Sequence, residues 1–209
     1  MRVVLTGFEP FGGDRTNPSW DAVSRVVPTG YELVTAELPC SFAESVPALR
    51  ALVAEHRPDV VVCVGQAGGR AAITPERVAI NLDDARIADN TGAQPIDEPV
   101  VPDGPAAYFT TLPVKACVAA LREAGIPAAV SHTAGTFVCN HVFYALMHLV
   151  ATEHPGLRAG FVHVPYAPEQ GHADAPSLPI DTVAEALNLI ITTTLTTTTD
   201  LPTTAGTLH

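Results

Sequence analysis

The sequence predicts a single α/β/α domain with a mostly parallel, twisted sheet flanked by helices. Short apolar runs alternate along the chain with longer amphipathic stretches, and this alternation is typical of an α/β fold. The chain has 209 residues, of which 47% are hydrophobic and 16% charged. That length supports one substantial core, but not a second full domain. We therefore expect one domain over residues 1–191 and a Thr-rich C-terminal tail over 192–209.

Four apolar runs, each bounded by Gly, Pro or polar residues, are predicted to form strands. They are Arg2–Thr6, Asp59–Val64, Ala128–Ser131 and Gly160–Val164. Amphipathic stretches predict helices, with Pro-containing turns ending several of them. These helices are Ser19–Val27, Ala43–His56, Val114–Ala124, Phe137–Glu153 and Ser177–Ile191. Two further strand-like pieces, Glu32–Leu38 and Val78–Asn81, extend the sheet or pair at its edge.

Two segments show neither the helical nor the strand pattern of apolar residues. Residues 83–113 are dense in Pro, Gly and Asp, and we expect an ordered loop over the site or at a subunit contact, because long irregular segments in compact domains are usually functional. Residues 192–199 are nearly all Thr, which is a poor helix former. We expect extended or solvated chain there, dispensable for chemistry.

Charge and hydropathy narrow the class of protein. The formal net charge is −11 and the pI is near 5.0, which argues against nucleic acid or an anionic membrane as partner because both are polyanions. No apolar stretch reaches the ~18 residues that a membrane span requires, and Met1–Gly7 is too short for the apolar region of a signal peptide. We expect a cytoplasmic enzyme.

The four cysteines are too few and too scattered for a disulfide scaffold. Cys40, Cys63 and Cys117 lie in apolar surroundings, so we interpret them as buried packing residues. Cys139 differs, because it follows a predicted strand and a Gly-containing turn and falls in the first turn of a long predicted helix. Unpaired N–H groups there favour a thiolate, lower the thiol pKa and can hold an oxyanion.

His163 is the candidate base for this thiol. It lies at the C-terminal end of a predicted strand, and parallel strands bring their C-terminal ends to one rim, where ligands bind in open α/β sheets. Glu76 follows another such strand and is a candidate to orient the imidazole. An equally open interpretation of Glu76 is an exposed carboxylate paired with Arg77 or Arg70.

Two other kinds of site fit less well. A metal site from Cys139, His132, His141 and His163 lacks the spacing that helix-borne zinc ligands usually show. The Gly-rich start, Thr6–Gly13, has neither a dinucleotide fingerprint nor a P-loop lysine, and Pro10 removes an N–H. Its Phe8 and Phe11 predict instead an apolar wall for a small, flat ligand.

Several ordered blocks of this sequence resemble the pyroglutamyl peptidase I family (pyrrolidone-carboxylate peptidases). The likeness runs from Met1 to about Gln170. It is carried by Thr6–Gly13, Asn17–Trp20, Glu76–Asn81, Asp84–Asn90, Asp103–Tyr108, Thr133–His141 and His163–Tyr166.

The resemblance implies a cysteine peptidase that hydrolyses the N-terminal pyroglutamyl (5-oxoproline) residue from peptides through a thioester acyl-enzyme. It implies a triad of Glu76, Cys139 and His163, and places Arg86 beside the oxyanion. The residues that it implies for the lactam pocket are Phe8, Phe11, Asn17 and Gln66. It further implies a cytosolic homotetramer with no metal and no other cofactor.

The chain departs from the family pattern at two places. His132 stands where we expect Asn, and the Thr-rich tail replaces an ordinary helical end, which shortens the last helix or changes its packing. Two other functions remain open from the residues alone. One is a nucleoside phosphorylase-like enzyme that recruits Gly68–Arg70 and Arg86 for phosphate, and the other is a catalytically silent binding protein for capped peptides.

Overall fold

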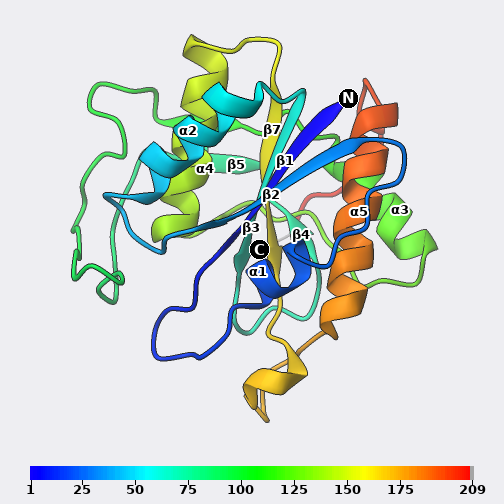
Figure 1. The fold of residues 1–209 in the computed structure, drawn as a ribbon, viewed down its shortest axis with the longest axis horizontal. Helices are drawn as coiled ribbons and strands as arrows, with labels where there is room; N and C mark the ends of the chain where they lie inside the picture. Colours follow the sequence, from blue (N-terminus) through cyan, green and yellow to red (C-terminus); the bar gives the residue numbers. More distant parts are fainter. Residues whose placement is uncertain (208–209) are drawn as a thin grey trace.

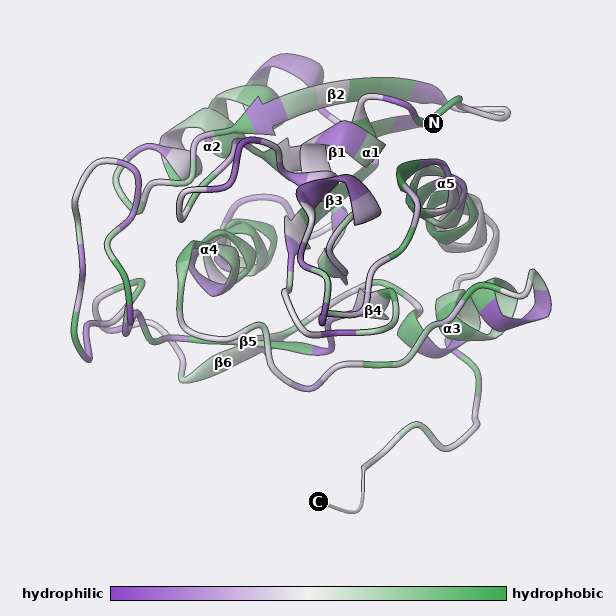
Figure 2. Ribbon diagram, turned by 90° about the horizontal axis from the view of Figure 1, so that it is seen from below, coloured by the Kyte–Doolittle hydropathy of each residue, from purple (hydrophilic) through white to green (hydrophobic). Residues whose placement is uncertain are grey.

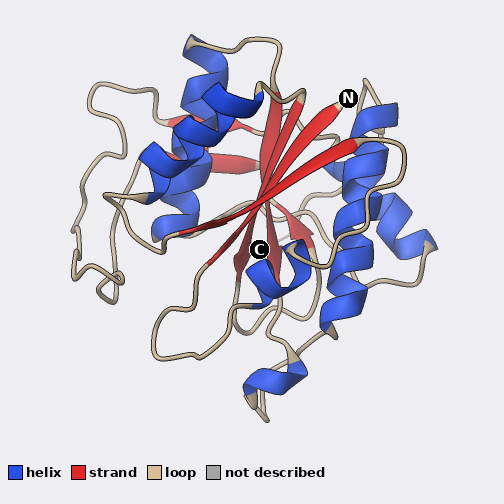
Figure 3. Cartoon of the chain, viewed as in Figure 1, coloured by secondary structure: helices blue, strands red, loops and turns tan. Residues whose placement is uncertain are grey.

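A computed structural model describes residues 1–207 as an α/β domain built on a twisted five-stranded sheet (Figures 1 and 3). The strand order is β2-β1-β3-β7-β4. The first four strands run parallel, and β4 is antiparallel to β7 at the edge, so the predicted fold class is confirmed. The bounds are β1 Arg2–Phe8, β2 Glu32–Leu38, β3 Val60–Gln66, β4 Thr74–Pro75 and β7 Arg158–Val164.

Helices cover both faces of this sheet (Figure 2). On one face lie α2 (Ser45–His56) and α4 (Val138–Thr152). On the other lie α1 (Pro18–Val23), α3 (Val114–Glu123) and α5 (Ile180–Thr196). A small sheet of β5 (Val78–Ile80) and β6 (Ala107–Phe109) packs against α4, and a single 3-10 turn, η1, spans Pro168–Gln170.

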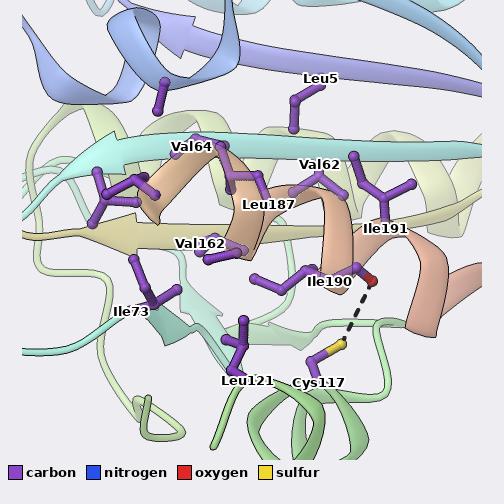
Figure 4. Close-up of a cluster of buried hydrophobic side chains, with 14 of the residues drawn as sticks. Leu5, Val62, Val64, Ile73, Cys117, Leu121, Val162, Leu187, Ile190 and Ile191 are labelled. Carbon is purple, nitrogen blue, oxygen red and sulfur yellow. Dashed lines mark hydrogen bonds between the residues drawn. The ribbon is translucent and has the colours of Figure 1, made fainter. Parts of the chain in front are cut away.

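The core consists of two apolar layers, one on each face of the sheet. Every residue from Val60 to Val64 is fully buried, as expected for a central parallel strand covered by helices on both faces. Figure 4 shows the layer under α5, where Leu187 and Ile190 meet Val62 and Val162. Cys117 packs in this layer, and its thiol donates to the carbonyl oxygen of Ile190 at 3.8 Å, so this cysteine is the packing residue that the sequence predicts.

The predicted strand at 128–131 is present only as two isolated parallel bridges, Ile73↔Ala128 and Glu76↔Ser131. Backbone N–H groups of Ala129 and Ser131 bond to the carbonyls of Ile73 and Pro75. The ladder is interrupted between them because Pro75 has no N–H to donate. The segment therefore runs beside β4 without forming a strand of its own.

The last helix differs most from the expectation. It continues to Thr196, so the prediction of extended or solvated chain from Thr192 is wrong for five residues, and the expected boundary at 191/192 falls inside α5. Thr194 is fully buried, and its carbonyl accepts a hydrogen bond from Arg158. Such packing outweighs the low helix propensity of Thr.

The chain beyond α5 returns to the body of the domain. The carboxylate of Asp200 accepts the backbone N–H groups of Lys115 and Ala116, at 3.1 and 2.9 Å, in the first turn of α3. The imidazole Nε2 of His132 lies 3.2 Å from the carbonyl oxygen of Ala205. The two departures from the family pattern, His132 and the tail, thus contact each other. Residues 208 and 209, the end of the predicted tail, lie outside the described residues.

The segment 83–113 is an ordered loop that ends in β6. Its backbone pairs Asp83 with Glu98. The side chain of Asn90 donates to the carboxylate of Glu9 at 2.8 Å, and the carboxylate of Asp89 accepts the N–H of Phe42 at 2.8 Å. These contacts fix the loop beside the C-terminal ends of β1 and β2.

Candidate active site

The register between β3 and β7 brings Cys139 and His163 together. Gly65 pairs with His163 across these strands, and neighbouring strands lie ~4.8 Å apart. Cys139 is in the first turn of α4, as predicted, and its Sγ lies directly over Gly65. A Cβ on Gly65 would be 2.7 Å from this sulfur, so only glycine leaves room for the thiol beside the imidazole.

Glu76 contacts the imidazole of His163 from the side of β7 that faces away from β3. Its Oε1 lies 2.7 Å from His163 Nδ1, and the side chain is fully buried. The backbone N–H of Glu76 bonds to the carbonyl of Phe161 in β7 at 2.9 Å, which fixes the carboxylate next to that strand. The interpretation of Glu76 as an exposed carboxylate is therefore wrong.

Arg70 also contacts Glu76; the sequence suggests it only as a surface partner of Glu76 or as a phosphate ligand. Its guanidinium donates to Glu76 Oε1 at 2.6 Å, to Thr74 at 2.6 Å and to the carbonyl of Thr133 at 2.8 Å. The other partner considered, Arg77, has no ion pair with Glu76 among residues 1–207. The signal for Arg70 was its place in the loop after β3, at the rim of the sheet.

Burial and the charges of Glu76, His163 and Arg70 together set the protonation states of Glu76 and His163. Burial by itself would raise the pKa of Glu76, but the hydrogen bond and charge of His163 and the charge of Arg70 hold the pKa below its ordinary value. Burial lowers the pKa of His163, against the opposing effect of Glu76. The resting pair is therefore a carboxylate and a neutral imidazole. Because the carboxylate only accepts, Nδ1 carries the proton and Nε2 is left as an acceptor.

The thiol of Cys139 does not follow the expectation of a lowered pKa. Burial raises its pKa, the charge of Glu76 adds to this, and Arg70 opposes it. Loss of hydration disfavours the thiolate relative to the neutral thiol. The resting nucleophile is thus a neutral thiol that needs a neutral base to accept its proton.

The aromatic residues predicted for the pocket have different environments. Phe8 is only 2% exposed and packs on Phe161 with ring centroids 6.3 Å apart, so it supports the site from within the core. Phe11 is partly exposed and lies 6.0 Å from Phe137 between ring centroids. Phe137 is the residue before α4 and was not singled out from the sequence as a wall residue. The one feature of the sequence that could have indicated this role is its position two residues before Cys139.

The polar residues predicted for the pocket also have different environments. Asn17 is buried and caps α1, since its Oδ1 accepts the N–H of Ser19 at 3.0 Å and its amide donates to the carbonyl of Glu9 at 2.9 Å. Gln66 ends β3 at the rim of the sheet and contacts Gln170, whose Nε2 lies 2.9 Å from Gln66 Oε1. Arg86 is exposed on the loop between β5 and β6. Gln170 was not singled out by the sequence.

Residues 1–207 contain no group of three or more His, Cys, Asp or Glu side chains arranged to hold a metal ion. The histidines of the metal alternative are engaged elsewhere, His132 with Ala205 and His141 with Asp83. In the same part of the chain, no helix is both long enough and apolar enough to span a bilayer.

A thiol at a helix start, beside an imidazole oriented by a carboxylate, is the arrangement of a cysteine peptidase. The chain belongs to the pyroglutamyl peptidase family, whose model matches residues 1–197.

Relatives and solved structures agree with this assignment. The pyrrolidone-carboxylate peptidase of Streptomyces coelicolor is 65% identical over 194 residues, which cover 91% of this chain and 90% of the relative. The crystal structure of pyroglutamyl peptidase I from Bacillus amyloliquefaciens is 50% identical, with a TM-score of 0.95 over 97% of this chain and 99% of that one. The pyrrolidone carboxyl peptidase of Thermococcus litoralis is 39% identical, with a TM-score of 0.88 over 93% of each chain.

Proposed function

We propose that this protein hydrolyses the N-terminal pyroglutamyl residue from peptides, with Cys139 as nucleophile, His163 as base and acid, and Glu76 as the orienting carboxylate. The observation that carries the proposal is the 2.7 Å contact between Glu76 Oε1 and His163 Nδ1, on a strand whose neighbour, Gly65, lies under the sulfur of Cys139. The family assignment supplies the substrate class.

Acylation begins when His163 Nε2 takes the proton of the Cys139 thiol as Sγ attacks the scissile carbonyl. The imidazolium that forms is stabilised by the Glu76 carboxylate. The carbonyl oxygen becomes an oxyanion, which N–H groups in the first turn of α4 can hold. His163 then gives its proton to the leaving amine, the C–N bond breaks, and the pyroglutamyl group remains on sulfur as a thioester.

Deacylation uses the same base on water. His163 Nε2 removes a proton from a water molecule as its oxygen attacks the thioester carbonyl. The C–S bond then breaks, the thiolate recovers the proton from the imidazolium, and pyroglutamate leaves as a carboxylic acid that ionises in water. The neutral thiol and neutral imidazole of the resting site are restored.

Recognition of the substrate requires contacts suited to a neutral, flat lactam, because its ring nitrogen is acylated and carries no positive charge. The partly exposed ring of Phe11 supplies an apolar wall, and Gln66 supplies an amide at the rim. Asn17 holds the start of α1, so we assign it the task of shaping the loop that carries Phe11. Phe8 supports this wall from the core, and Arg86 is assigned to the oxyanion side.

Release of free pyroglutamate from a capped peptide, compared with the same peptide uncapped, tests the function. We expect release from the capped peptide only, and its loss after treatment with iodoacetamide. Turnover that requires inorganic phosphate would favour the phosphorylase-like alternative instead. Tight binding of the capped peptide without release would favour a silent binding protein.

The proposal includes a cytoplasmic location and a homotetramer. The low charged fraction, 16%, is consistent with surface buried between subunits, and Phe109 at the end of β6 is 68% exposed in the single chain. Light scattering on the purified protein measures the assembly, and a monomeric mass at micromolar concentration would contradict the tetramer.

A further inference from the structure

A glycine-containing turn after β3 brings Arg70 to the rim of the sheet. The backbone N–H of Arg70 bonds to the carbonyl of Ala67 at 3.3 Å, and Gly69 lies between them with φ +85°, a conformation that side chains rarely adopt. A Cβ on Gly68 would overlap the hydroxyl group of Tyr166. Both glycines therefore permit the turn that places Arg70.

The planar guanidinium of Arg70 contacts three parts of the site. Its Nη1 donates to Thr74 Oγ1 and to Glu76 Oε1, both at 2.6 Å, and its Nη2 donates to the carbonyl oxygen of Thr133 at 2.8 Å. The hydroxyl of Thr74 donates in turn to the carbonyl oxygen of His163 at 3.3 Å. One arginine thus contacts β4, the orienting carboxylate and the turn that leads to the start of α4.

The charged form of Glu76 has few groups that favour it. Oε1 accepts from both Arg70 and His163, whereas Oε2 is buried and has no hydrogen-bond partner within residues 1–207. The titratable groups beside the carboxylate are the imidazole of His163 on β7 and the thiol of Cys139 on α4, and both are neutral in the resting site. Arg70 is then the one cation paired with Glu76 in this part of the chain. Since a buried carboxylate without a cation takes up a proton, the charge of Glu76 depends on Arg70.

The charge of Glu76 decides which tautomer His163 adopts. A carboxylate only accepts, so Nδ1 carries the imidazole proton and Nε2 is a free acceptor. A protonated Glu76 would donate its O–H to Nδ1, and the proton of the neutral imidazole would then lie on Nε2. Such an imidazole cannot take the proton of Cys139. Loss of the charge on Glu76 would therefore remove the base without moving a heavy atom.

We infer that Arg70 is a positioning residue that keeps Glu76 an ionised acceptor and so leaves Nε2 of His163 free to take the proton of Cys139. The inference deepens the proposed function and rests on it. Arg70 takes no part in the proton transfers themselves and acts through Glu76. It also opposes protonation of His163 in the resting site, because two cations would then share one carboxylate oxygen.

The Arg70→Met variant tests this role through the pH profile. Without the guanidinium, Glu76 ionises only at higher pH and His163 is protonated more readily, so both changes act in the same direction. We expect the midpoint of the rise in kcat/KM to move to higher pH by about one unit or more, as for loss of a cation in contact with a carboxylate. kcat near neutral pH should fall by about tenfold or more, the loss of one hydrogen bond to a charged group, and KM should change much less.

Two further variants separate the charge of Arg70 from its shape. Arg70→Lys keeps the charge but lacks the planar fork that holds Glu76 and Thr133 together, so its midpoint should return close to that of the native protein while kcat stays reduced. Arg70→Gln keeps a donor without the charge and should show the same displacement as Arg70→Met. It replaces Arg70→Met if circular dichroism shows that the Met variant does not fold.

Arg50→Met is the matched control. Arg50 pairs with Glu153 at 2.8 Å on the surface, at the other end of α4 from Cys139. This variant removes the same charge and also an arginine–glutamate pair, and it should leave both kcat and the midpoint unchanged.

Alkylation of Cys139 by iodoacetamide reports on the same base without a substrate, because the thiol loses its proton when it reacts. Its rate against pH should show the same displacement in Arg70→Met. A fall in kcat at every pH with no displacement in either profile would overturn the inference, as would an equal displacement in Arg70→Lys and Arg70→Met. Absence of pyroglutamate release by the native protein is a failure of the proposed function itself, and the alkylation profiles still test Arg70.

Discussion

Two histidines among residues 1–207 contact a carboxylate through Nδ1 at 2.7 Å, His163 with Glu76 and His141 with Asp83. Their surroundings differ. Glu76 is fully buried and also pairs with Arg70. Asp83 lies in the 83–113 loop and has no arginine partner within residues 1–207. The second oxygen of each carboxylate lacks a hydrogen-bond partner in this part of the chain. The contact distance alone therefore does not separate a catalytic pair from a structural one.

The position of the Cys139 thiol distinguishes the two histidines. His163 is the register partner of Gly65, over which the sulfur of Cys139 lies. His141 is two residues after Cys139 in α4, which places it about 200° around the helix from the thiol. It faces Phe42 at 5.4 Å between ring centroids and ties the loop to the helix. The proposed chemistry therefore belongs to His163 with Glu76, and His141 with Asp83 is expected to anchor the loop.

The largest effect is expected from Cys139→Ser, which removes the proposed nucleophile. kcat/KM for a pyroglutamyl-naphthylamide should fall by about three or more orders of magnitude. Cys117→Ser is the matched control, because this thiol packs under α5 on the other face of the sheet. Undiminished hydrolysis in Cys139→Ser would sink the assignment of the nucleophile.

Exchange of each histidine for asparagine tests the comparison directly. His163→Asn removes the base and should lower kcat/KM by about 10²- to 10⁴-fold. His141→Asn should leave most of the activity and lower the free energy of unfolding by about 1–3 kcal/mol, since Asp83 loses its partner. Urea denaturation and steady-state kinetics measure both quantities. An equal loss of activity in the two variants would remove the distinction.

The carboxylates give a smaller contrast. Glu76→Gln keeps the shape but loses the charge that stabilises the imidazolium, so kcat/KM should fall by about 10²- to 10³-fold, less than after loss of Cys139. Asp83→Asn should change the rate far less. Circular dichroism verifies that both variants fold. If Glu76→Gln behaves like Asp83→Asn, then Glu76 belongs to a structural ion pair with Arg70.

The smallest effect is a shift in the pH profile. In the proposed mechanism neutral His163 is the base, and burial holds its pKa below the ordinary value. kcat/KM should therefore rise with pH through a midpoint below about 6.5 and then level off. Glu76 raises the pKa of His163, and in Glu76→Gln the residual activity should have its midpoint at a still lower pH. In Asp83→Asn the midpoint should stay in place. A higher midpoint in Glu76→Gln would contradict the electrostatics of the pair.

Local sequence was sufficient for much of the fold and for two site residues. The buried run Val60–Val64 and the Gly-containing turn before Cys139 are local signals, and His163 ends an apolar strand. Interactions between distant segments were harder to predict. Pro75 interrupts pairing with a segment more than 50 residues later, and α5 extends through threonines because Arg158 and the core hold its last turns.

The sequence by itself determined the α/β layering, the cysteine at a helix start and the histidine at a strand end, because each depends on a local pattern of apolar and turn residues. Only the tertiary structure decided that Glu76 is buried against His163, that Gly65 makes room for the sulfur, and that burial raises the thiol pKa. It also decided that Gln170 donates a hydrogen bond to Gln66. Burial and hydrogen-bond direction depend on groups brought together from distant parts of the chain, and no local pattern records them.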